Sequence, residues 1–392
     1  MNLLLSDYEK KLTSWASVGL LVFVSAFLWA PSRDGLQVVF FLSFFLPGIA
    51  LYIFHSPKRY EYLNYTTIIA LTYGFFSLLS TLWGDPDSFG HFFLQWVVLA
   101  VWLFGASIVI CRSAINIQKC IFGLLILGCL TIISTIIYYY FVYGISNAPL
   151  RIVGWNVFRN PNEFGSMCGI ITLLAVIGAF QAISLRQSYF YYLLAVIGFI
   201  GLVLSFSRAA ILAFFITALL SLIIIRPSVK VWLPPVSIIL IGLVWFMLTN
   251  GISDYYTEGR GTGLSSRLII WNDVLNKSIN HMFTGIGMSE NTNITIDNVG
   301  VFNHAHNAWV DTYYRTGIIG LFLIVCHLAF LFRVSFLDKK ILPFFLWLLY
   351  GCVCIFFDGR CFFWEIGAKW FLYWIPAGLI VAFACSKHSV AK

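Results

Sequence analysis

Charge is what this sequence has least of. Asp, Glu, Lys and Arg together make up 10% of the 392 residues, whereas 60% are hydrophobic and the mean hydropathy is +0.89. A soluble domain carries about 25% charged residues, so the composition excludes an ordinary soluble protein. Short alternating strands are also missing. The apolar residues stand instead in unbroken runs such as 189–206 and 209–225, which excludes an outer-membrane type barrel and leaves helices as the way to cross a bilayer.

Apolar stretches of spanning length recur along the whole chain. A helix rises about 1.5 Å per residue, so roughly 20 residues cross the apolar core of a membrane. Twelve stretches qualify, at about 14–30, 36–54, 65–83, 92–110, 120–143, 164–183, 189–206, 209–225, 231–249, 317–334, 341–357 and 370–384. The sequence therefore predicts an all-α polytopic membrane protein with about twelve transmembrane helices.

The distribution of charge predicts the topology of these spans. With the N-terminus inside, the inner loops and termini hold fourteen of the 24 Lys and Arg residues but only four of the 16 acidic residues. This asymmetry follows the positive-inside rule and places both termini in the cytoplasm. The net charge of +8 is then a topology signal with some attraction to membrane lipids, not a sign of a nucleic-acid partner.

Cysteine on the oxidising side of the membrane is almost absent. Six of the nine cysteines fall within predicted spans and two face the cytoplasm, which leaves only Cys361 outside. The sequence therefore offers no disulfide framework.

Two external segments depart from the short connections found elsewhere. The first runs over 144–163, and the second, 250–316, is the longest polar stretch of the chain. The chain thus divides into spans one to nine (1–249), a large external loop (250–316), and spans ten to twelve with a tail (317–392). Within the loop, Leu264, Leu268, Trp271, Leu275 and Ile279 recur at steps of three and four, which predicts an amphipathic helix over 264–280 with its N-cap at Ser265 or Ser266.

Four external arginines are candidates for binding an anion. Arg267 would lie in the first turn of that helix, where backbone N–H groups and a guanidinium together favour phosphate oxygens. Arg208 lies between two spans that have almost no other polar residue. Arg151 and Arg159 stand in the first external segment. The alternatives are that Arg267 pairs with Asp273 and that Arg208 extends to lipid headgroups.

A histidine motif ends the large loop and resembles a known family. The pattern is His306-Asn307, nine residues, then Gly317-x-x-Gly320. It resembles the motif of bacterial O-antigen ligases, membrane glycosyltransferases that attach O-antigen to lipid A-core. The twelve spans and the large loop agree with this superfamily of ligases and polymerases, as do Ser207-Arg208-Ala209, Arg267-x3-Trp271 and Gly285-Ile286-Gly287.

The resemblance implies a reaction and a location. The donor would be an O-antigen glycan on undecaprenyl pyrophosphate, the acceptor a sugar hydroxyl of lipid A-core, and no metal or other cofactor would take part. The fold would be similar to membrane-embedded glycosyltransferases of the C type (GT-C-like). The enzyme would sit in the bacterial inner membrane with its active site, including the large loop, in the periplasm.

The residues matched by the motif have roles that suit this chemistry. Arg208 and Arg267 would hold the pyrophosphate, where negative charge grows as the C1–O bond breaks. His306 would take the proton of the acceptor hydroxyl, since a histidine ordinarily titrates near 6.5. Attack opposite the leaving group would invert the anomeric centre.

Further residues are assigned by their neighbourhood. His304, Asn307, Arg159 and Arg151 are expected to contact substrate, and Asp358 is expected to orient His306 unless it pairs with Arg360. A metal site at His304-x-His306 is the rival for the histidines.

Three other functions stay open on the sequence alone. An O-antigen polymerase and a protein O-oligosaccharyltransferase would use the same kind of donor. A secondary transporter or flippase would also explain twelve spans with charge among them.

Overall fold

The computed structural model describes residues 2–54, 64–113, 115–144, 151–233, 236, 263–296, 300–335 and 341–390. The described residues up to 225 form long helices joined by shorter helical pieces: α1 (Asn2–Trp29), α2 (Arg33–Val39), the π-helix η1 (Phe40–Phe45), α3 (Leu46–Phe54), α4 (Tyr65–Leu79), η3 (Ser80–Leu82), η4 (Pro86–Ser88), α5 (Phe89–Arg112), α6 (Ile117–Tyr143), α7 (Pro161–Phe180), α8 (Leu185–Leu204) and α9 (Arg208–Ile225).

The remaining elements begin with a small extramembrane unit. It contains α12 (Gly263–Ser278), the 3₁₀ turn η5 (Ile279–His281) and an antiparallel pair of short strands, β1 (Ile294–Ile296) and β2 (Gly300–Phe302). The chain then continues through α13 (Ala308–Ser335), α14 (Leu342–Phe357), α15 (Ala368–Leu372) and α16 (Trp374–Val390).

The helices confirm an all-α membrane protein. Within the described residues, nine helical segments are long and apolar enough to cross a membrane, and the apolar stretches Leu342–Phe357 and Trp374–Cys385 are shorter. These eleven correspond to eleven of the twelve predicted spans. The other, 231–249, lies almost wholly outside the described residues, so the total of twelve and the likeness to C-type glycosyltransferases stay predictions.

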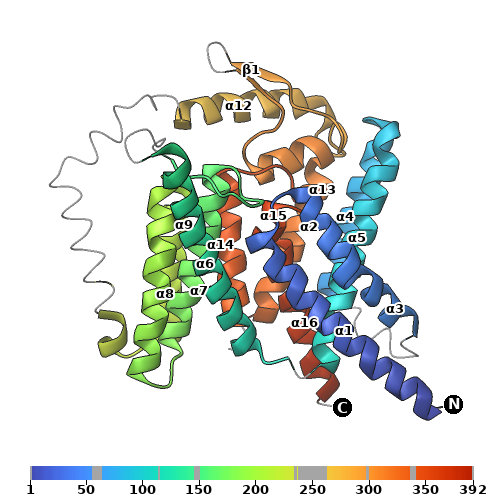
Figure 1. Cartoon of the computed structure of the whole chain (residues 1–392). Helices are drawn as coiled ribbons and strands as arrows, with labels where there is room; N and C mark the ends of the chain where they lie inside the picture. Colours follow the sequence, from blue (N-terminus) through green and yellow to red (C-terminus); the bar gives the residue numbers. More distant parts are fainter. Residues whose placement is uncertain are drawn as a thin grey trace.

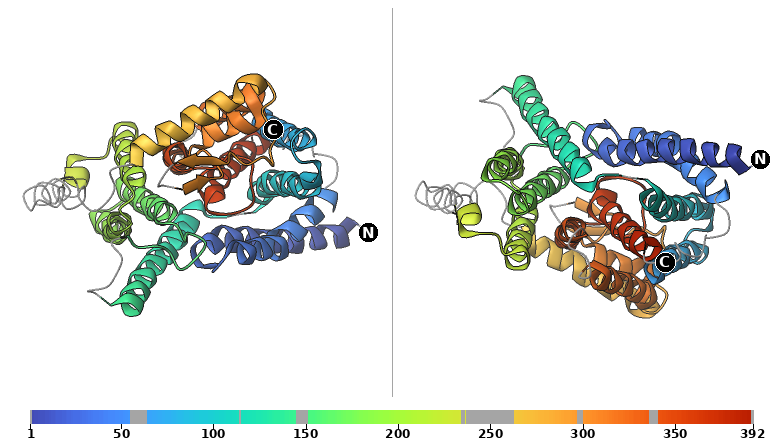
Figure 2. Two further views of the ribbon diagram at one scale, coloured as in Figure 1. Left: turned by 90° about the horizontal axis from the view of Figure 1, so that it is seen from above. Right: turned by 90° about the horizontal axis from the view of Figure 1, so that it is seen from below.

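The helices stand side by side as a bundle, with both chain ends at its lower side in Figure 1. At the opposite side, α12 and β1 lie across the top of the bundle (Figure 1). Seen from above, α12 follows one edge of the bundle from α9 toward α13 (Figure 2). The termini therefore share one side and the unit built from the large loop occupies the other, as the charge distribution predicts.

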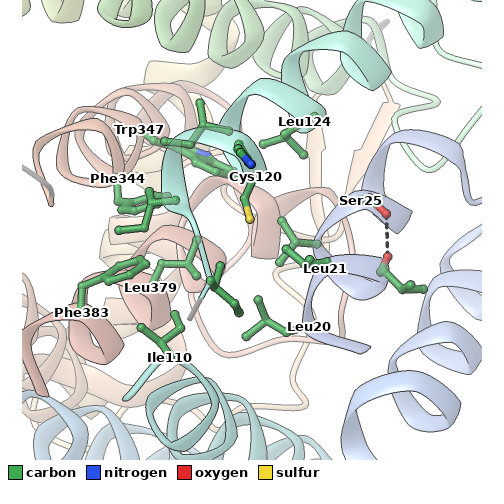
Figure 3. A pocket seen from close by; sticks show the side chains of 17 residues that line it. Leu20, Leu21, Ser25, Ile110, Cys120, Leu124, Phe344, Trp347, Leu379 and Phe383 are labelled. Atoms are coloured by element: carbon green, nitrogen blue, oxygen red, sulfur yellow. Dashed lines mark hydrogen bonds between the residues drawn. The ribbon is translucent and has the colours of Figure 1, made fainter. Parts of the chain in front are cut away.

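An apolar cavity of about 460 Å³ lies among α1, α6, α14 and α16, in the half of the bundle that holds the two termini. Figure 3 shows side chains such as Leu20, Cys120, Phe344 and Leu379 arranged around it. Because the histidine motif lies at the other end of the bundle, this cavity is not part of the site described below.

The helix predicted over 264–280 is present as α12, but two details of the prediction are wrong. The helix begins at Gly263, so Ser265 and Ser266 are not its N-cap and Arg267 lies in its second turn. The buried face is also different. Ile270 and Val274 pack into a small core with Ile294, Ala305 and Tyr314, whereas Leu268, Leu275 and Ile279 are exposed. The three- and four-residue spacing finds one apolar stripe, and this helix has two.

Candidate active site

A break in α13 holds the histidine motif against the rest of the loop. Gly317 interrupts the helix with φ 63° and ψ −165°, and a side chain there would meet the backbone oxygen of Phe283 at 2.2 Å. The freed backbone groups pair with the Gly285-Ile286-Gly287 segment: Ile286 N–H donates to the Tyr314 oxygen at 2.9 Å, and Gly287 N–H to that of Arg315 at 3.0 Å. The two glycine motifs are therefore packing partners.

A buried ion pair joins this scaffold to the segment that follows α14. Arg315 Nε donates to Asp311 Oδ2 at 2.8 Å, and both side chains are fully buried. Asp311 also accepts the backbone N–H groups of Ala305 at 3.1 Å and Cys361 at 2.9 Å. Arg315 donates further to the carbonyls of Met288 and Glu290. Asp311 thus connects Ala305, which precedes His306, with Cys361, which follows Asp358.

His306 and Asp358 form a hydrogen-bonded pair at the centre of the site. His306 Nδ1 lies 3.0 Å from Asp358 Oδ1, and the two side chains are 28% and 13% exposed. Burial alone would raise the pKa of Asp358, but the hydrogen bond from His306 and the charge of Lys369 hold it well below its usual range. Asp358 is therefore ionised and only accepts, so in the neutral form of the His306 ring the proton is on Nδ1 and the lone pair on Nε2.

The predicted alternative, that Asp358 pairs with Arg360, is not what the structure shows. The guanidinium of Arg360 lies over the ring of Trp364, 4.2 Å from its centroid. The carboxylate of Asp358 contacts His306 instead, and its role in orienting that ring stays a prediction.

A relay of hydrogen bonds extends from this pair to Arg151. Asn162 Nδ2 donates to Asp358 Oδ2 at 2.7 Å, and Arg151 Nη2 donates to Asn162 Oδ1 at 2.8 Å. Arg151 Nε also donates to the Ser205 carbonyl at 3.2 Å. These hydrogen bonds therefore connect His306 with α7 and with the segment before α9. The guanidinium of Arg151 is bonded to protein groups within this network.

Asn307 and His304 occupy positions beside the base. Asn307 is buried and its oxygen accepts the N–H groups of Trp309 at 2.9 Å and Val310 at 3.2 Å, which caps α13. The ring of His304 lies 4.0 Å from that of His306, and burial together with the charges of His306 and Lys369 lowers the pKa of His304 to about 3. His304 is therefore neutral near pH 7. Substrate contact by either residue stays a prediction.

Arg208 and Arg267 lie on different elements, and neither is among the residues that line the polar cavity described below. Arg208 is exposed at the first position of α9, and Arg267 is half-buried on α12. Burial lowers the pKa of Arg267, the charge of Asp358 raises it, and the charge of Arg208 lowers it further. The charges of both residues therefore act on Arg267. The expected alternative partner of Arg267, Asp273, forms an ion pair with Lys277 at 3.1 Å instead.

A polar cavity of about 800 Å³ opens beside the histidines. Its wall contains His304, His306 and Asp358 together with cations and carboxylates from four other segments: Arg33, Asp34, Arg159, Glu163, Glu365 and Lys369. Arg159 is exposed and donates to the Pro31 carbonyl at 2.8 Å. Mixed cations and carboxylates suit a ligand rich in hydroxyl groups, because both kinds of side chain can bond to a hydroxyl.

Asn162, Arg33 and Lys369 are among the residues of the site that the sequence analysis did not assign. Asn162 lies in the first turn of α7, directly after the Asn160-Pro161 start of the helix, and no motif marks it. Arg33 and Lys369 lie at the outer ends of spans. The reasoning that singled out Arg151 and Arg159, external cations that topology does not explain, could have found both.

One trio has the geometry of a metal site. His304, His306 and Asp358 each offer one ligand atom, and these atoms lie within 4.8 Å of one another. The rival prediction lacked a carboxylate near the two histidines, and folding supplies one. A metal bound through Nδ1 of His306 would displace the proton that the 3.0 Å contact uses, so the two arrangements exclude each other at that nitrogen.

The fold and the site define a multi-pass helical membrane protein with a histidine–carboxylate pair in a polar cavity at one end of its bundle. Residues 193–325, about a third of the chain, match the family described as O-antigen ligase. This match supports a place for the chain in the O-antigen ligase and polymerase superfamily, whose members are membrane glycosyltransferase-like enzymes of lipopolysaccharide biosynthesis. A comparison with curated proteins gives no match. The matched range holds Arg208, Arg267 and His306, while Asn162 and Asp358 lie outside it.

Proposed function

We propose that the protein is an O-antigen ligase that transfers O-antigen glycan from undecaprenyl pyrophosphate to a sugar hydroxyl of lipid A-core at the periplasmic face of the inner membrane. The observation that carries the proposal is the His306–Asp358 hydrogen bond at 3.0 Å in the wall of the polar cavity. A base beside a cavity that suits a hydroxyl-rich acceptor is what this transfer needs, and the charge of Asp358 also acts on Arg267 of α12.

The proposed reaction uses the imidazole of His306 as the base. Nε2 of His306 removes the proton of the acceptor hydroxyl, and the oxygen attacks the anomeric carbon of the donor. The C1–O bond breaks, and its electron pair leaves with the pyrophosphate, where Arg208 and Arg267 stabilise the growing negative charge. A glycosidic bond of inverted configuration and undecaprenyl pyrophosphate are the products. Asp358 stabilises the imidazolium that forms.

The other residues of the site are assigned by their contacts. Asn162 and Arg151 are proposed as positioning residues, because the hydrogen bonds that connect them to the base run through Asp358. Arg159 and His304 line the cavity and are proposed to contact the acceptor, together with Arg33 and Lys369.

Transfer assays with purified lipid-linked donor and lipid A-core test the proposal. His306→Ala should abolish glycan transfer with donor binding largely preserved, whereas Arg208→Ala and Arg267→Ala should weaken donor binding. Arg186→Ala, a change in the turn at the start of α8, serves as the control. Normal turnover by His306→Ala would refute the assignment of the base.

A genetic test separates the ligase from its relatives. Loss of the gene should leave lipid A-core uncapped while donor accumulates. Core that carries a single repeat would identify a polymerase instead. A transporter would keep its function in a folded His306→Ala variant.

A further inference from the structure

The exposed side of α12 carries an apolar stripe that no other segment covers among the residues that the structure describes. Leu268, Leu275 and Ile279 lie along it, and Met282 continues it beyond η5. Their spacings of seven, four and three residues place these side chains on one helical face. Ile279 is 59% exposed, although an aliphatic side chain of that size is normally withdrawn from water.

The stripe lies between two faces of different character. On one side, Ile270 and Val274 are buried in the small core, and the ring of Trp271 contacts Phe356 near the outer end of α14, with centroids 5.8 Å apart. On the other side, Asn276 and Lys277 are exposed. One face of α12 thus packs on protein, one is polar, and the stripe separates them.

The stripe is continuous with the outer surface of a membrane span. Ile318 N–H donates to the Met282 carbonyl at 2.8 Å, and Ile319 N–H to that of Phe283 at 3.3 Å. Beyond this junction, the outward side chains of α13 are apolar, and Phe322 is 63% exposed. Because α13 is long and apolar enough to cross a membrane, we expect that surface to meet lipid.

We infer that α12 is an interfacial helix whose stripe inserts into the outer leaflet at the boundary between headgroups and acyl chains. The occupant is the phospholipid bilayer itself. An amphipathic helix in this plane buries its apolar face about 5–10 Å deep while its polar face stays in water. Figures 1 and 2 show α12 lying across the bundle along one edge, which is the orientation that this contact requires.

The contact has a consequence for the site. Arg267 directly precedes Leu268, so the depth of the stripe sets the height of the Arg267 guanidinium relative to the membrane. The inference itself does not depend on the proposed reaction.

Photo-crosslinking in a bilayer tests the inference. The photoreactive residue p-benzoylphenylalanine is placed at Leu275 in one full-length variant and at the adjacent, polar Asn276 in another. Both are purified, checked for monodispersity and reconstituted in nanodiscs of phosphatidylethanolamine and phosphatidylglycerol. After illumination, mass spectrometry should find several-fold more phospholipid adduct at position 275 than at 276. A second pair, Ile279 and Asn280, should give the same contrast and guards against a folding defect at one position.

Three outcomes would overturn the inference. Equal lipid adducts at both members of each pair would mean that the face of α12 does not matter. Adducts from 275 and 279 to a second copy of the chain would identify a protein interface instead. An absence of lipid adducts from all four positions would place α12 in water.

Discussion

The direction of the relay makes Asp358→Asn an informative change. Arg151 can only donate, so Asn162 must turn its oxygen toward Arg151 and its amide nitrogen toward position 358. An amide at position 358 must then turn its own oxygen to Asn162 and its NH₂ group to Nδ1 of His306. Nδ1 becomes an acceptor, and the imidazole proton moves to Nε2, where the base needs a lone pair.

The expected loss of transfer rate in Asp358→Asn follows from the loss of general base catalysis by His306. General base catalysis contributes about 10²- to 10⁴-fold to a rate, which corresponds to about 3–5 kcal/mol of barrier at about 1.4 kcal/mol per tenfold. Asp358→Asn should therefore slow transfer by about 10²-fold or more. Donor affinity should change far less, because Arg208 and Arg267 are unaltered. Single-turnover rates and donor binding, measured separately on the purified variant, check both statements.

The double variant Asn162→Asp/Asp358→Asn provides a rescue. The new carboxylate at 162 accepts from Arg151 and from the new amide at 358, whose oxygen is then free to accept the Nδ1 proton of His306. The favourable tautomer returns, and at least about tenfold of the rate should return with it. If the single variant keeps the full rate, or the double variant is no faster than the single one, the orienting role of Asp358 is wrong.

Further expectations concern stability, pH and metal. Arg315→Met leaves a buried Asp311 without its partner and should cost about 3–5 kcal/mol, seen as a lower unfolding temperature in detergent; adding Asp311→Leu should recover part of it, and an unchanged temperature in the single variant would contradict the pairing. Gly317→Ala should destabilise by more than about 1 kcal/mol, because φ is 63° and its methyl group would meet Phe283; a neutral result in the same assay would mean that the break is not needed. The folded pKa of His304 is about 3, against about 6.5 when unfolded, so the unfolded state binds the proton first and stability should fall as pH drops below about 6.5. His304→Gln should flatten that slope, and an equal slope in both proteins would contradict the low pKa. Chelators should leave the transfer rate unchanged, whereas a loss that a divalent ion restores would favour metal binding by the histidine pair.

Much of the molecule follows from local sequence. Run length and the scarcity of charge suffice for the spans, because an apolar helix of about 20 residues is stable in a bilayer whatever its neighbours are. The presence of α12 follows from its helical spacing, and His306, Arg208 and Arg267 are found through short motifs. None of these inferences needs to know which segments meet.

Tertiary structure decided everything that depends on which segments meet. Asp358 is 52 residues from His306, and Asn162 is 196 residues from Asp358, so their hydrogen bonds exist only once α7, α13 and α14 have packed. The same holds for Arg33 and Lys369, which reach the cavity from opposite ends of the chain. The sequence predicts the wrong buried face for α12 because two apolar stripes compete, and the segments that pack against the helix, the hairpin and α13, determine which stripe is covered. Local sequence preferences specify single helices and strands. The site is made of contacts between residues of different elements, and no single position in the sequence indicates which distant residue it will contact.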